Sequence, residues 1–320
     1  MTSTVPAPTA QAHRLGPRCP RHPHGSYPRW VSPLPDGAAV PLKFENATAK
    51  ELVSIWLAAL GSLADLAESL TAAAWSTDSP CPGWTAGDVV AHVLALESEL
   101  HGVAVPEHEP DWATLPHVTS PFGQYTEVPV DWYRTKGRDV VLAELREIIA
   151  WREQDLADVS DDLTATVTGP AGWQTTSNQM FRTRILDTWM HEQDIRAAAD
   201  QPGGLDSDGA WVTAAQFLSG LPFVWGKSVG APVGSSLHLT LTGPGVELQR
   251  TVRLDDDKRA RFVEGSIHDP TLRMTLSWPL YAALSGGRRG AVAQAHNGAV
   301  TLEGDPTLAT SLLPALATTP

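Results

Sequence analysis

Apolar residues recur every three or four positions through the first half of the chain, which is the pattern of amphipathic helices. One such run crosses residues 52–70 and another crosses residues 140–156. Helices are also predicted around residues 85–97 and 181–196. Four helices of this kind pack as a bundle, so residues 44–202 are expected to form an N-terminal four-helix bundle.

The pattern changes after Gly203 and Gly204, where polar and apolar residues begin to alternate as in strands. Strands are expected at residues 236–242, 247–254, 272–276 and 299–303, after a helix at residues 208–218. Gly-Pro-Gly at residues 243–245 and Gly-Gly at residues 286–287 are typical of turns and lie between these strands. Residues 205–320 are therefore expected to form a smaller C-terminal α+β domain.

The first 43 residues hold nine of the 26 prolines and show no sustained apolar period. Such a composition buries too little apolar surface to offset its ordering entropy, so this segment is predicted to be a disordered tail. It contains His13, Cys19, His22 and His24. Their spacing matches no closed zinc pattern, which favours a low-complexity extension or an over-called start codon over a metal-binding tract.

Charge and hydropathy exclude some classes of function. The formal net charge is −13, and residues 44–320 carry 18 Lys and Arg against 35 Asp and Glu, so nucleic acid is not expected as a partner. We find no secretion signal in the tail and no stretch near the roughly 18 apolar residues of a membrane span. The protein is expected to be cytoplasmic, with no membrane partner.

The two cysteines, Cys19 and Cys81, are too few for a disulfide framework and fit a reducing compartment. Cys81 lies close to the predicted start of a helix, where a thiolate would be favoured. The alternative is a small buried loop residue, because a proline stands on each side of it.

Candidate chemistry begins with Asp187 and His191, which stand four residues apart and so share one face of a helix. A carboxylate and an imidazole one turn apart suit a divalent metal. The same spacing also suits an ion pair on a solvated face, so the pair alone leaves both interpretations open.

His92 is the candidate third ligand. Pro80, Pro82 and Gly83 interrupt any preceding structure, Thr85 suits an N-cap, and the first turn holds an acidic residue. His92 then lies two turns into a helix among apolar neighbours and is expected to face the core. A buried imidazole needs a partner, which is either a carbonyl group or, with Asp187 and His191, an open divalent site.

Roughly 35 residues connect the second predicted helix to the third, which is too long for a plain connection. The segment is rich in prolines and aromatic residues, namely Pro106, Pro110, Trp112, Pro116, Pro121, Phe122, Tyr125 and Trp132. We expect a loop that either forms a wall of a substrate site or packs across one end of the bundle.

The runs at residues 81–92 and 187–196 together resemble the mycothiol-dependent maleylpyruvate isomerase family, whose metal-binding domain is a DinB-like four-helix bundle. The resemblance implies that His92, Asp187 and His191 hold a divalent metal, with zinc as the first candidate. The carboxylate ligand of the characterised isomerase is a glutamate, whereas this chain has the shorter Asp187, a swap that is compatible with metal binding.

The second half resembles the sterol-carrier-protein-like domain that follows the bundle in this family, so that the resemblance covers residues 46–320. It implies an active-site arginine at Arg288 or Arg289, after the Gly-Gly turn. Such an arginine would clamp an anionic substrate. The alternative is that both are solvated loop arginines.

A metal held by two imidazoles and a carboxylate keeps positions for a thiol and deprotonates it. The resemblance implies mycothiol as that external, low-molecular-weight thiol, acting on a small electrophile that is expected to be anionic. The reaction would be a cis-trans isomerisation or a thiol S-transfer, and the sequence leaves both open. Two other classes also stay open: a carrier of apolar ligands with a structural metal, and a metal-dependent hydrolase.

Overall fold

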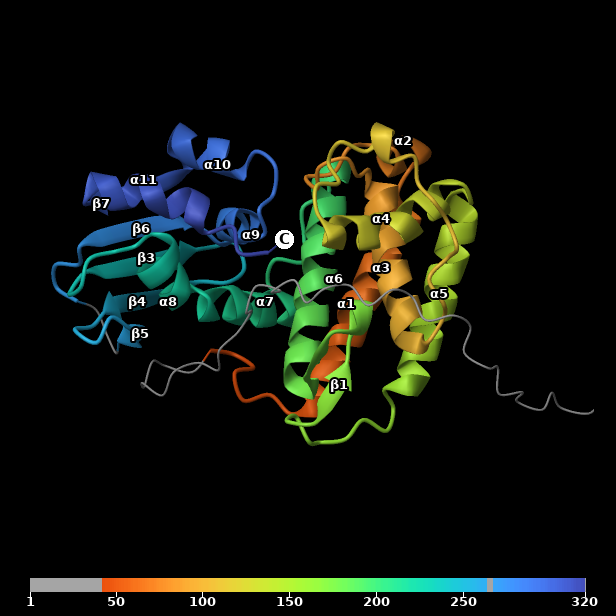
Figure 1. Ribbon diagram of the computed structural model, residues 1–320, viewed down its shortest axis with the longest axis horizontal. Helices are drawn as coiled ribbons and strands as arrows, with labels where there is room; N and C mark the ends of the chain where they lie inside the picture. The colour runs from red at the N-terminus through yellow and green to blue at the C-terminus, as the bar shows by residue number, and fades with distance from the viewer. Residues whose placement is uncertain (1–41, 264–266, 320) are drawn as a thin grey trace, which may run out of the picture. The chain divides into compact units, whose positions relative to one another are not determined.

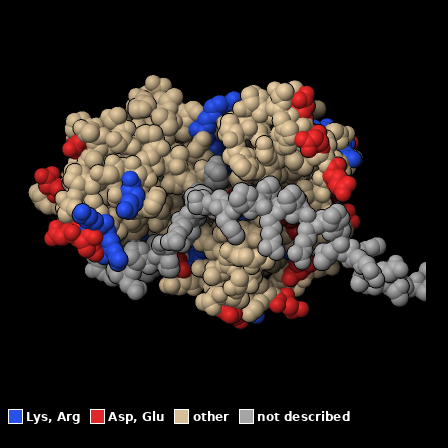
Figure 2. Space-filling model, viewed as in Figure 1, with Lys and Arg blue, Asp and Glu red and all other residues tan. Residues whose placement is uncertain are grey.

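The computed structural model describes residues 42–263 and 267–319. Nearly all of the predicted tail, with His13, Cys19, His22 and His24, lies outside the described residues. At its end, the Lys43 Nζ atom lies 2.6 Å from the Asp208 Oδ1 atom. Figure 1 shows the order of the elements, and Figure 2 shows one face with Asp and Glu side chains at several separate points.

Four long helices make up the predicted bundle and lie side by side (Figure 1). They are α1 (Ala49–Ser69), α3 (Ala86–His101), α5 (Arg138–Asp155) and α6 (Ser177–Ala199). Short elements join them: α2 (Ala72–Trp75), η1 (Trp112–Thr114), the hairpin of β1 (Thr166–Thr168) and β2 (Gln174–Thr176), and η2 (Pro170–Gly172). The expected N-terminal helical fold is thus confirmed.

Helix α1 starts at a capping box in which the Thr48 side chain accepts from the Glu51 backbone and the Glu51 carboxylate accepts in return. Contrary to the sequence-based expectation, α1 has the length and apolar composition of a membrane span. It is the single such helix in the described part of the chain, and 56% of its apolar window is buried inside the protein. Burial in a bundle core explains this composition.

The long connection between the second and third predicted helices was expected to be a loop, and this expectation is wrong. Residues Pro121–Arg134 form helix α4, which packs on α3. Ser120 is its N-cap and Pro121 takes the first turn, where a missing N–H group costs no hydrogen bond. Pro129 lies inside the helix and is nevertheless accommodated. The high proline content of this segment therefore did not prevent a helix from forming.

The C-terminal part contains a five-stranded sheet in the order β5-β4-β3-β6-β7. Strands β3 and β6 are parallel, and the other neighbours are antiparallel. The strands are β3 (Ser236–Thr242), β4 (Leu248–Leu254), β5 (Ala260–Val263), β6 (Leu272–Ser277) and β7 (Val300–Gly304). Four of them match the predicted strands, and β5 was missed because its four residues show no clear alternation.

Helices complete this α+β part. They are α7 (Asp208–Ser219), α8 (Leu221–Phe223), η3 (Val224–Ser228), α9 (Trp278–Ser285), α10 (Ala291–Gln294), η4 (Ala295–Ala299) and α11 (Pro306–Ala315). Only α7 had been predicted from the sequence.

Helix α6 contributes to two hydrophobic clusters. Phe181 and Ile185 pack in the cluster of the bundle, whereas Trp189 and Met190 belong to the cluster around the sheet. The Trp189 ring stacks on Trp278 with centroids 5.3 Å apart. Both clusters therefore fix the position of α6, the helix that carries Asp187 and His191.

Candidate metal centre

Helices α3 and α6 bring His92, Asp187 and His191 together. The His92 Nε2 atom lies 3.9 Å from Asp187 Oδ1, and the His191 Nε2 atom lies 3.5 Å from the same oxygen. The two imidazole centroids are 4.8 Å apart with an edge-to-face arrangement. The candidate ligand atoms of all three residues lie within 4.8 Å of one another.

Local sequence explains the position of His92. Thr85 is the N-cap of α3, its hydroxyl accepts from the Asp88 backbone N–H, and the Asp88 carboxylate accepts in return from Thr85. This is the predicted helix start, and it places His92 two turns inside α3. The His92 residue is only 5% exposed, as expected for an imidazole that faces the core.

The three residues fit a metal ion by their spacing and by their chemistry. Tetrahedral ligands about 2.1 Å from a zinc ion lie about 3.4 Å apart, close to the distances found here. The His191 Nδ1 atom is 3.0 Å from Asp194 Oδ2, so a hydrogen on Nδ1 leaves Nε2 free to bind the ion. A carboxylate behind a histidine is the usual support of a metal ligand.

The two histidines differ in this support. The His92 Nδ1 atom is buried and has no hydrogen-bond partner within residues 42–263 and 267–319. His92 therefore lacks the carboxylate that orients His191.

Arg184 controls the charge of Asp187. Its Nη1 atom donates to Asp187 Oδ2 at 2.9 Å. Burial by itself would raise the pKa of Asp187, but Arg184 and His191 outweigh burial and hold that pKa well below its usual range. Asp187 is thus kept ionised, as a ligand must be.

Behind Arg184 stands Glu97, which is fully buried. Its Oε1 atom accepts from Arg184 Nη2 at 2.8 Å and from Trp56 Nε1 at 3.2 Å. Its other oxygen accepts from Arg152 Nε at 3.3 Å. A buried carboxylate between two arginines holds Arg184 toward Asp187 without an unpaired charge.

Burial shifts the pKa of each imidazole downward, and the neighbours decide the net result. For His191, Asp187 and Asp194 outweigh burial and raise the pKa well above its usual value. For His92, burial dominates and the pKa is lowered. His92 is therefore neutral at pH 7, whereas His191 holds a proton that a metal ion would have to displace.

The support of His191 extends to the C-terminal part of the chain. Arg288 Nε donates to Asp194 Oδ1 at 2.9 Å, and Arg288 Nη2 donates to Asp194 Oδ2 at 2.7 Å. Burial raises the pKa of Asp194, but Arg288 and His191 outweigh it and lower that pKa to about 2. The Arg288 guanidinium is thus already hydrogen-bonded to a carboxylate of the protein.

Cys81 also contacts this carboxylate, since its Sγ atom lies 3.1 Å from Asp194 Oδ2. Cys81, His191 and Asp194 form a second group close enough to share an ion. The group of His92, Asp187 and His191 is the better candidate, because both oxygens of Asp194 already accept hydrogen bonds from Arg288.

Arg289 lies apart from this network. Its side chain is 55% exposed, and its Nη2 atom donates to the Ser79 carbonyl at 3.1 Å. Of the arginines on α6, Arg196 makes an ion pair with Glu192 at 2.7 Å. Arg182 donates to the backbone carbonyls of residues 44 and 45.

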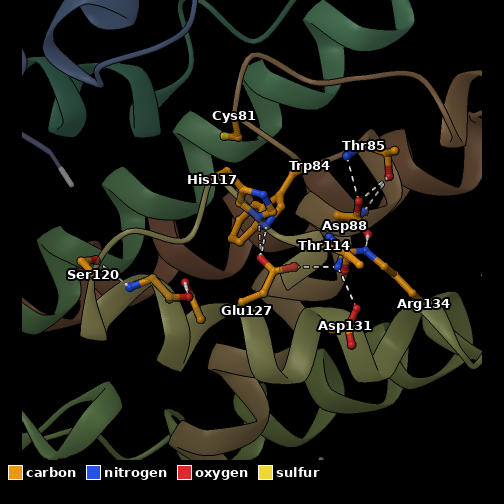
Figure 3. A network of polar contacts seen from close by, with 12 residues as sticks. Cys81, Trp84, Thr85, Asp88, Thr114, His117, Ser120, Glu127, Asp131 and Arg134 are labelled. Carbon is orange, nitrogen blue, oxygen red and sulfur yellow. Dashed lines mark hydrogen bonds and ion pairs between the residues drawn. The ribbon is translucent and has the colours of Figure 1, made fainter. Parts of the chain in front are cut away.

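An indole covers both candidate histidines. The Trp84 ring centroid lies 4.9 Å from that of His92 and 6.3 Å from that of His191. Trp84 Nε1 donates to Glu127 Oε2 at 2.7 Å, and His117 Nε2 lies 3.0 Å from the same oxygen. Figure 3 shows Trp84 and His117 meeting at this buried carboxylate.

Arg134 completes the network of Figure 3. Its Nη1 atom donates to Glu127 Oε1 at 2.6 Å, and its Nε atom donates to Asp88 Oδ1 at 2.9 Å. Asp88 in turn caps α3, so the indole and the start of α3 are fixed by one set of bonds. Sequence reasoning missed Glu127, His117 and Arg134, because they lie in the segment that had been expected to be an irregular loop.

Comparison with known proteins finds a similarity in the helical part. Residues 56–196 match the profile of the mycothiol maleylpyruvate isomerase N-terminal domain. These residues, which are less than half of the chain, are therefore similar to that domain. The matched range contains His92, Asp187 and His191. A search of curated protein sequences finds no significant match.

Two solved structures resemble the chain over most of its length. One is a histidine-to-alanine mutant of mycothiol-dependent maleylpyruvate isomerase, with a TM-score of 0.50, 15% identity, and 82% of this chain and 96% of that chain covered. The other is the mycothiol-dependent maleylpyruvate isomerase, with a TM-score of 0.47, 16% identity, and coverage of 78% and 92%. At this identity, the first likeness shows the fold alone.

Two cavities lie close to the candidate metal centre, one lined by His92 and the other by Asp194. The one on the His92 side, called here the bundle cavity, has a volume of about 220 Å³. It is lined by His92, Ala95, Leu96, Ser98, Glu99, Val103, Ala104, Val105, Pro106, Tyr125, Thr126, Pro129, Trp132, Tyr133 and Glu144. Three of the aromatic and proline residues that the sequence suggested as a substrate wall line it, namely Pro106, Tyr125 and Trp132.

The other cavity, called here the arginine cavity, has a volume of about 330 Å³. It lies between α6 and the segment of α9 and α10, and its lining includes Met190, Asp194, Arg196, Asp200, Arg288 and Arg289. The lining therefore contains both acidic and basic side chains. The two predicted arginines therefore lie together, on the Asp194 side of His191.

Proposed function

We propose that this protein is a mycothiol-dependent metalloenzyme that adds the thiol to a small electrophile, in a cis-trans isomerisation or an S-transfer. One observation carries the proposal: two imidazole nitrogens and a carboxylate oxygen converge on one point inside the part of the chain that is similar to the mycothiol maleylpyruvate isomerase N-terminal domain. The supporting bond from Asp194 to His191 strengthens it.

His92, Asp187 and His191 would hold the ion, and two imidazoles with one carboxylate suit Zn²⁺. A bound ion of this kind lowers the pKa of a coordinated thiol, so that the thiolate forms at neutral pH. Arg184 keeps Asp187 ionised, and Asp194 sets the ring orientation of His191. The indole of Trp84 excludes water from one side of the imidazoles.

The proposed addition is balanced without any oxidant or reductant. The thiolate sulfur forms a C–S bond to one alkene carbon, and the π electrons move to the neighbouring carbon, next to a carbonyl group. In an isomerisation, the former double bond rotates, the C–S bond breaks, and the thiolate leaves with the trans alkene restored. In an S-transfer, the neighbouring carbon takes up the proton that the thiol lost, and the adduct is released.

Metal analysis combined with mass spectrometry tests the proposal. The purified protein, His92→Ala and His191→Ala would be compared by elemental analysis, with the exposed His296→Ala as a surface control. About one divalent ion per chain is expected in the wild type and in the control, and much less in the other two. Unchanged metal content in both His92→Ala and His191→Ala would show that the site is wrongly assigned.

The second arm incubates each protein with mycothiol and a panel of electrophiles. Metal-dependent formation of adducts or trans products supports the proposal. Retained metal with turnover of esters or amides, but no thiol chemistry, would favour a hydrolase that uses bound water. Retained lipid after mild purification would favour a carrier.

A further inference from the structure

The two oxygens of the Asp187 carboxylate have different partners. Its Oδ1 atom lies 3.9 Å from His92 Nε2 and 3.5 Å from His191 Nε2, so it is the oxygen that faces the candidate metal centre. Its Oδ2 atom accepts a hydrogen bond from Arg184 Nη1 at 2.9 Å. Because a guanidinium occupies the second oxygen, Asp187 offers a single oxygen to an ion, together with one nitrogen from each imidazole.

Arg184 is held in this place from its other side. Its side chain is only 3% exposed, and its Nε and Nη2 atoms both donate to Glu97 Oε1, at 3.1 and 2.8 Å. Moving the guanidinium would break these bonds to a fully buried carboxylate, which is costly. The contact between Arg184 and Asp187 is therefore a fixed part of the fold.

Buried charges continue beyond Arg184 in an alternating row. Glu97 also accepts from Arg152 Nε at 3.3 Å, and Arg152 Nη1 donates to Asp155 Oδ2 at 2.8 Å. Two buried guanidinium groups thus share one buried carboxylate. The remaining positive charge is balanced at the ends of the row, by Asp155, whose side chain is 34% exposed, and by Asp187. Asp187 is therefore the counterion of Arg184 as well as a candidate ligand.

An ion bound by Asp187 would have to share the charge of this carboxylate with Arg184. A carboxylate behind a ligand, such as Asp194 behind His191, raises the basicity of that ligand. A guanidinium behind a ligand has the opposite effect, because it attracts the same negative charge and repels the ion. The ion would be bound less tightly and would keep more of its own charge for a further anionic ligand.

We propose that Arg184 is a positioning residue that acts on the metal through Asp187: it weakens metal binding and strengthens the binding of a thiolate at the remaining positions. This inference rests on the proposed function, since it concerns the same site. Glu97 opposes the effect, because it is the second counterion of Arg184. Neutralising Glu97 should therefore strengthen the action of Arg184, and neutralising both residues should abolish it.

The main test is the double variant Arg184→Gln with Glu97→Gln. It removes one charge of each sign, Arg152 keeps its bond to Asp155, and water can replace the guanidinium at Asp187, whose side chain is 24% exposed. At pH 8, chosen to keep Asp187 ionised, we expect Zn²⁺ affinity to be about tenfold higher than in the wild type, measured by competition with a chelator. If Arg184 only stabilised the structure of the site, its loss would lower this affinity. An unchanged or lower Zn²⁺ affinity would therefore overturn the proposal.

A monovalent anion that needs no deprotonation tests the second half of the proposal. Thiocyanate would be titrated into the cobalt-loaded wild type and double variant, and its binding followed by the visible absorption of Co²⁺. We expect about tenfold weaker thiocyanate binding by the variant, because Asp187 then gives its full charge to the ion. The two affinities thus change in opposite directions, which damage to the site would not produce. Equal or tighter thiocyanate binding by the variant would overturn the proposal.

The single variant Glu97→Gln should give the mirror result. Arg184 then has Asp187 as its main counterion, so Zn²⁺ should bind more weakly and thiocyanate more tightly than in the wild type. This variant decides the question if the double variant does not fold, and changes in the reverse direction would contradict the assigned role. A matched surface control is Glu68→Gln with Arg146→Gln, an ion pair whose side chains are 46% and 39% exposed. Both affinities should be unchanged in the control.

Incubation with mycothiol and electrophiles separates this inference from the proposed function. If the wild type binds Zn²⁺ but forms no adducts or trans products, the proposed function fails, while the Zn²⁺ and thiocyanate affinities still decide the role of Arg184. If the wild type binds no Zn²⁺, both fail.

Discussion

The two cavities beside the histidines differ in how their charges are balanced. In the bundle cavity, Glu99 and Glu144 face the ligand space with no arginine or lysine among the described lining residues. In the arginine cavity, Asp194 and Arg288 neutralise each other through two hydrogen bonds. The difference shows that an arginine near a site is an anion receptor only when the protein leaves its guanidinium unpaired.

The largest expected effect comes from Arg288→Ala. The change leaves Asp194 buried without its cation, which should destabilise the fold by about 3–5 kcal/mol. Through Asp194 and His191 it should also weaken metal binding about 10–100-fold. Arg289→Ala, at a side chain that is 55% exposed, should cost less than about 0.5 kcal/mol. Denaturant unfolding and competition with a chelator measure both quantities.

The predicted anion clamp gives a different result for the same positions. If Arg288 or Arg289 binds substrate carboxylate, the double alanine variant should keep its metal and its thiol binding. It should then lose about 2–4 kcal/mol of transition-state binding for an anionic substrate. Intact metal affinity in a folded Arg288→Ala variant would therefore contradict the supporting role and favour the clamp.

Asp194→Asn sharpens the comparison by removing charge while keeping an acceptor for His191. Metal affinity should fall about tenfold, the lower end of effects on supporting residues. Burial lowers the pKa of His191, but Asp187 and Asp194 raise it to well above its usual value. Below that pKa the ion must displace a proton, so wild-type affinity should increase with pH until His191 is deprotonated.

In Asp194→Asn one contribution that raises the pKa of His191 is lost. The pH profile of metal affinity should therefore reach its plateau at a lower pH than in the wild type. Chelator competition across a pH series measures the midpoint and the plateau separately. A profile with an unchanged midpoint would show that Asp194 does not control the protonation of His191.

What the sequence predicted correctly depends on neighbours within one helical turn. The Thr85 cap and the Asp187 and His191 pair follow from spacings of three and four residues, which a helix converts directly into contacts. The bond from Trp84 to Glu127 spans 43 residues, and the bond from Arg288 to Asp194 spans 94. No periodicity encodes such pairs.

Trp84→Phe tests the side of the metal centre that the indole covers. The variant leaves Glu127 with one donor fewer in a buried place, which should cost about 1–3 kcal/mol. In cobalt-loaded protein, the visible absorption bands should shift because the cover over both imidazoles changes. Trp112→Phe is a matched control, because Trp112 makes the same kind of bond to Glu109 at the surface. Equal effects of the two variants would contradict a covering role.

Tyr133→Phe should have the smallest effect. It removes the hydroxyl that donates to Glu144 at 2.9 Å, at a cost of about 0.5–1.5 kcal/mol measured by denaturant unfolding. Metal affinity, measured by competition with a chelator, should stay that of the wild type, because the Tyr133 hydroxyl bonds to Glu144 and not to a candidate ligand. A marked loss of metal affinity would show that this bond supports the metal centre.

The bond between Arg288 and Asp194 also determines when, during synthesis of the chain, the support of His191 can be completed. The 94 residues that separate them take roughly 5–20 seconds to synthesise at ordinary rates of translation. Until Arg288 emerges from the ribosome, Asp194 lacks its cation and His191 lacks its final support, although every proposed ligand already exists. We expect ribosome-arrested chains that end before Arg288 to take up metal weakly, and chains that end well beyond it to take up metal tightly. Equal uptake by both would show that the centre matures independently of the C-terminal part.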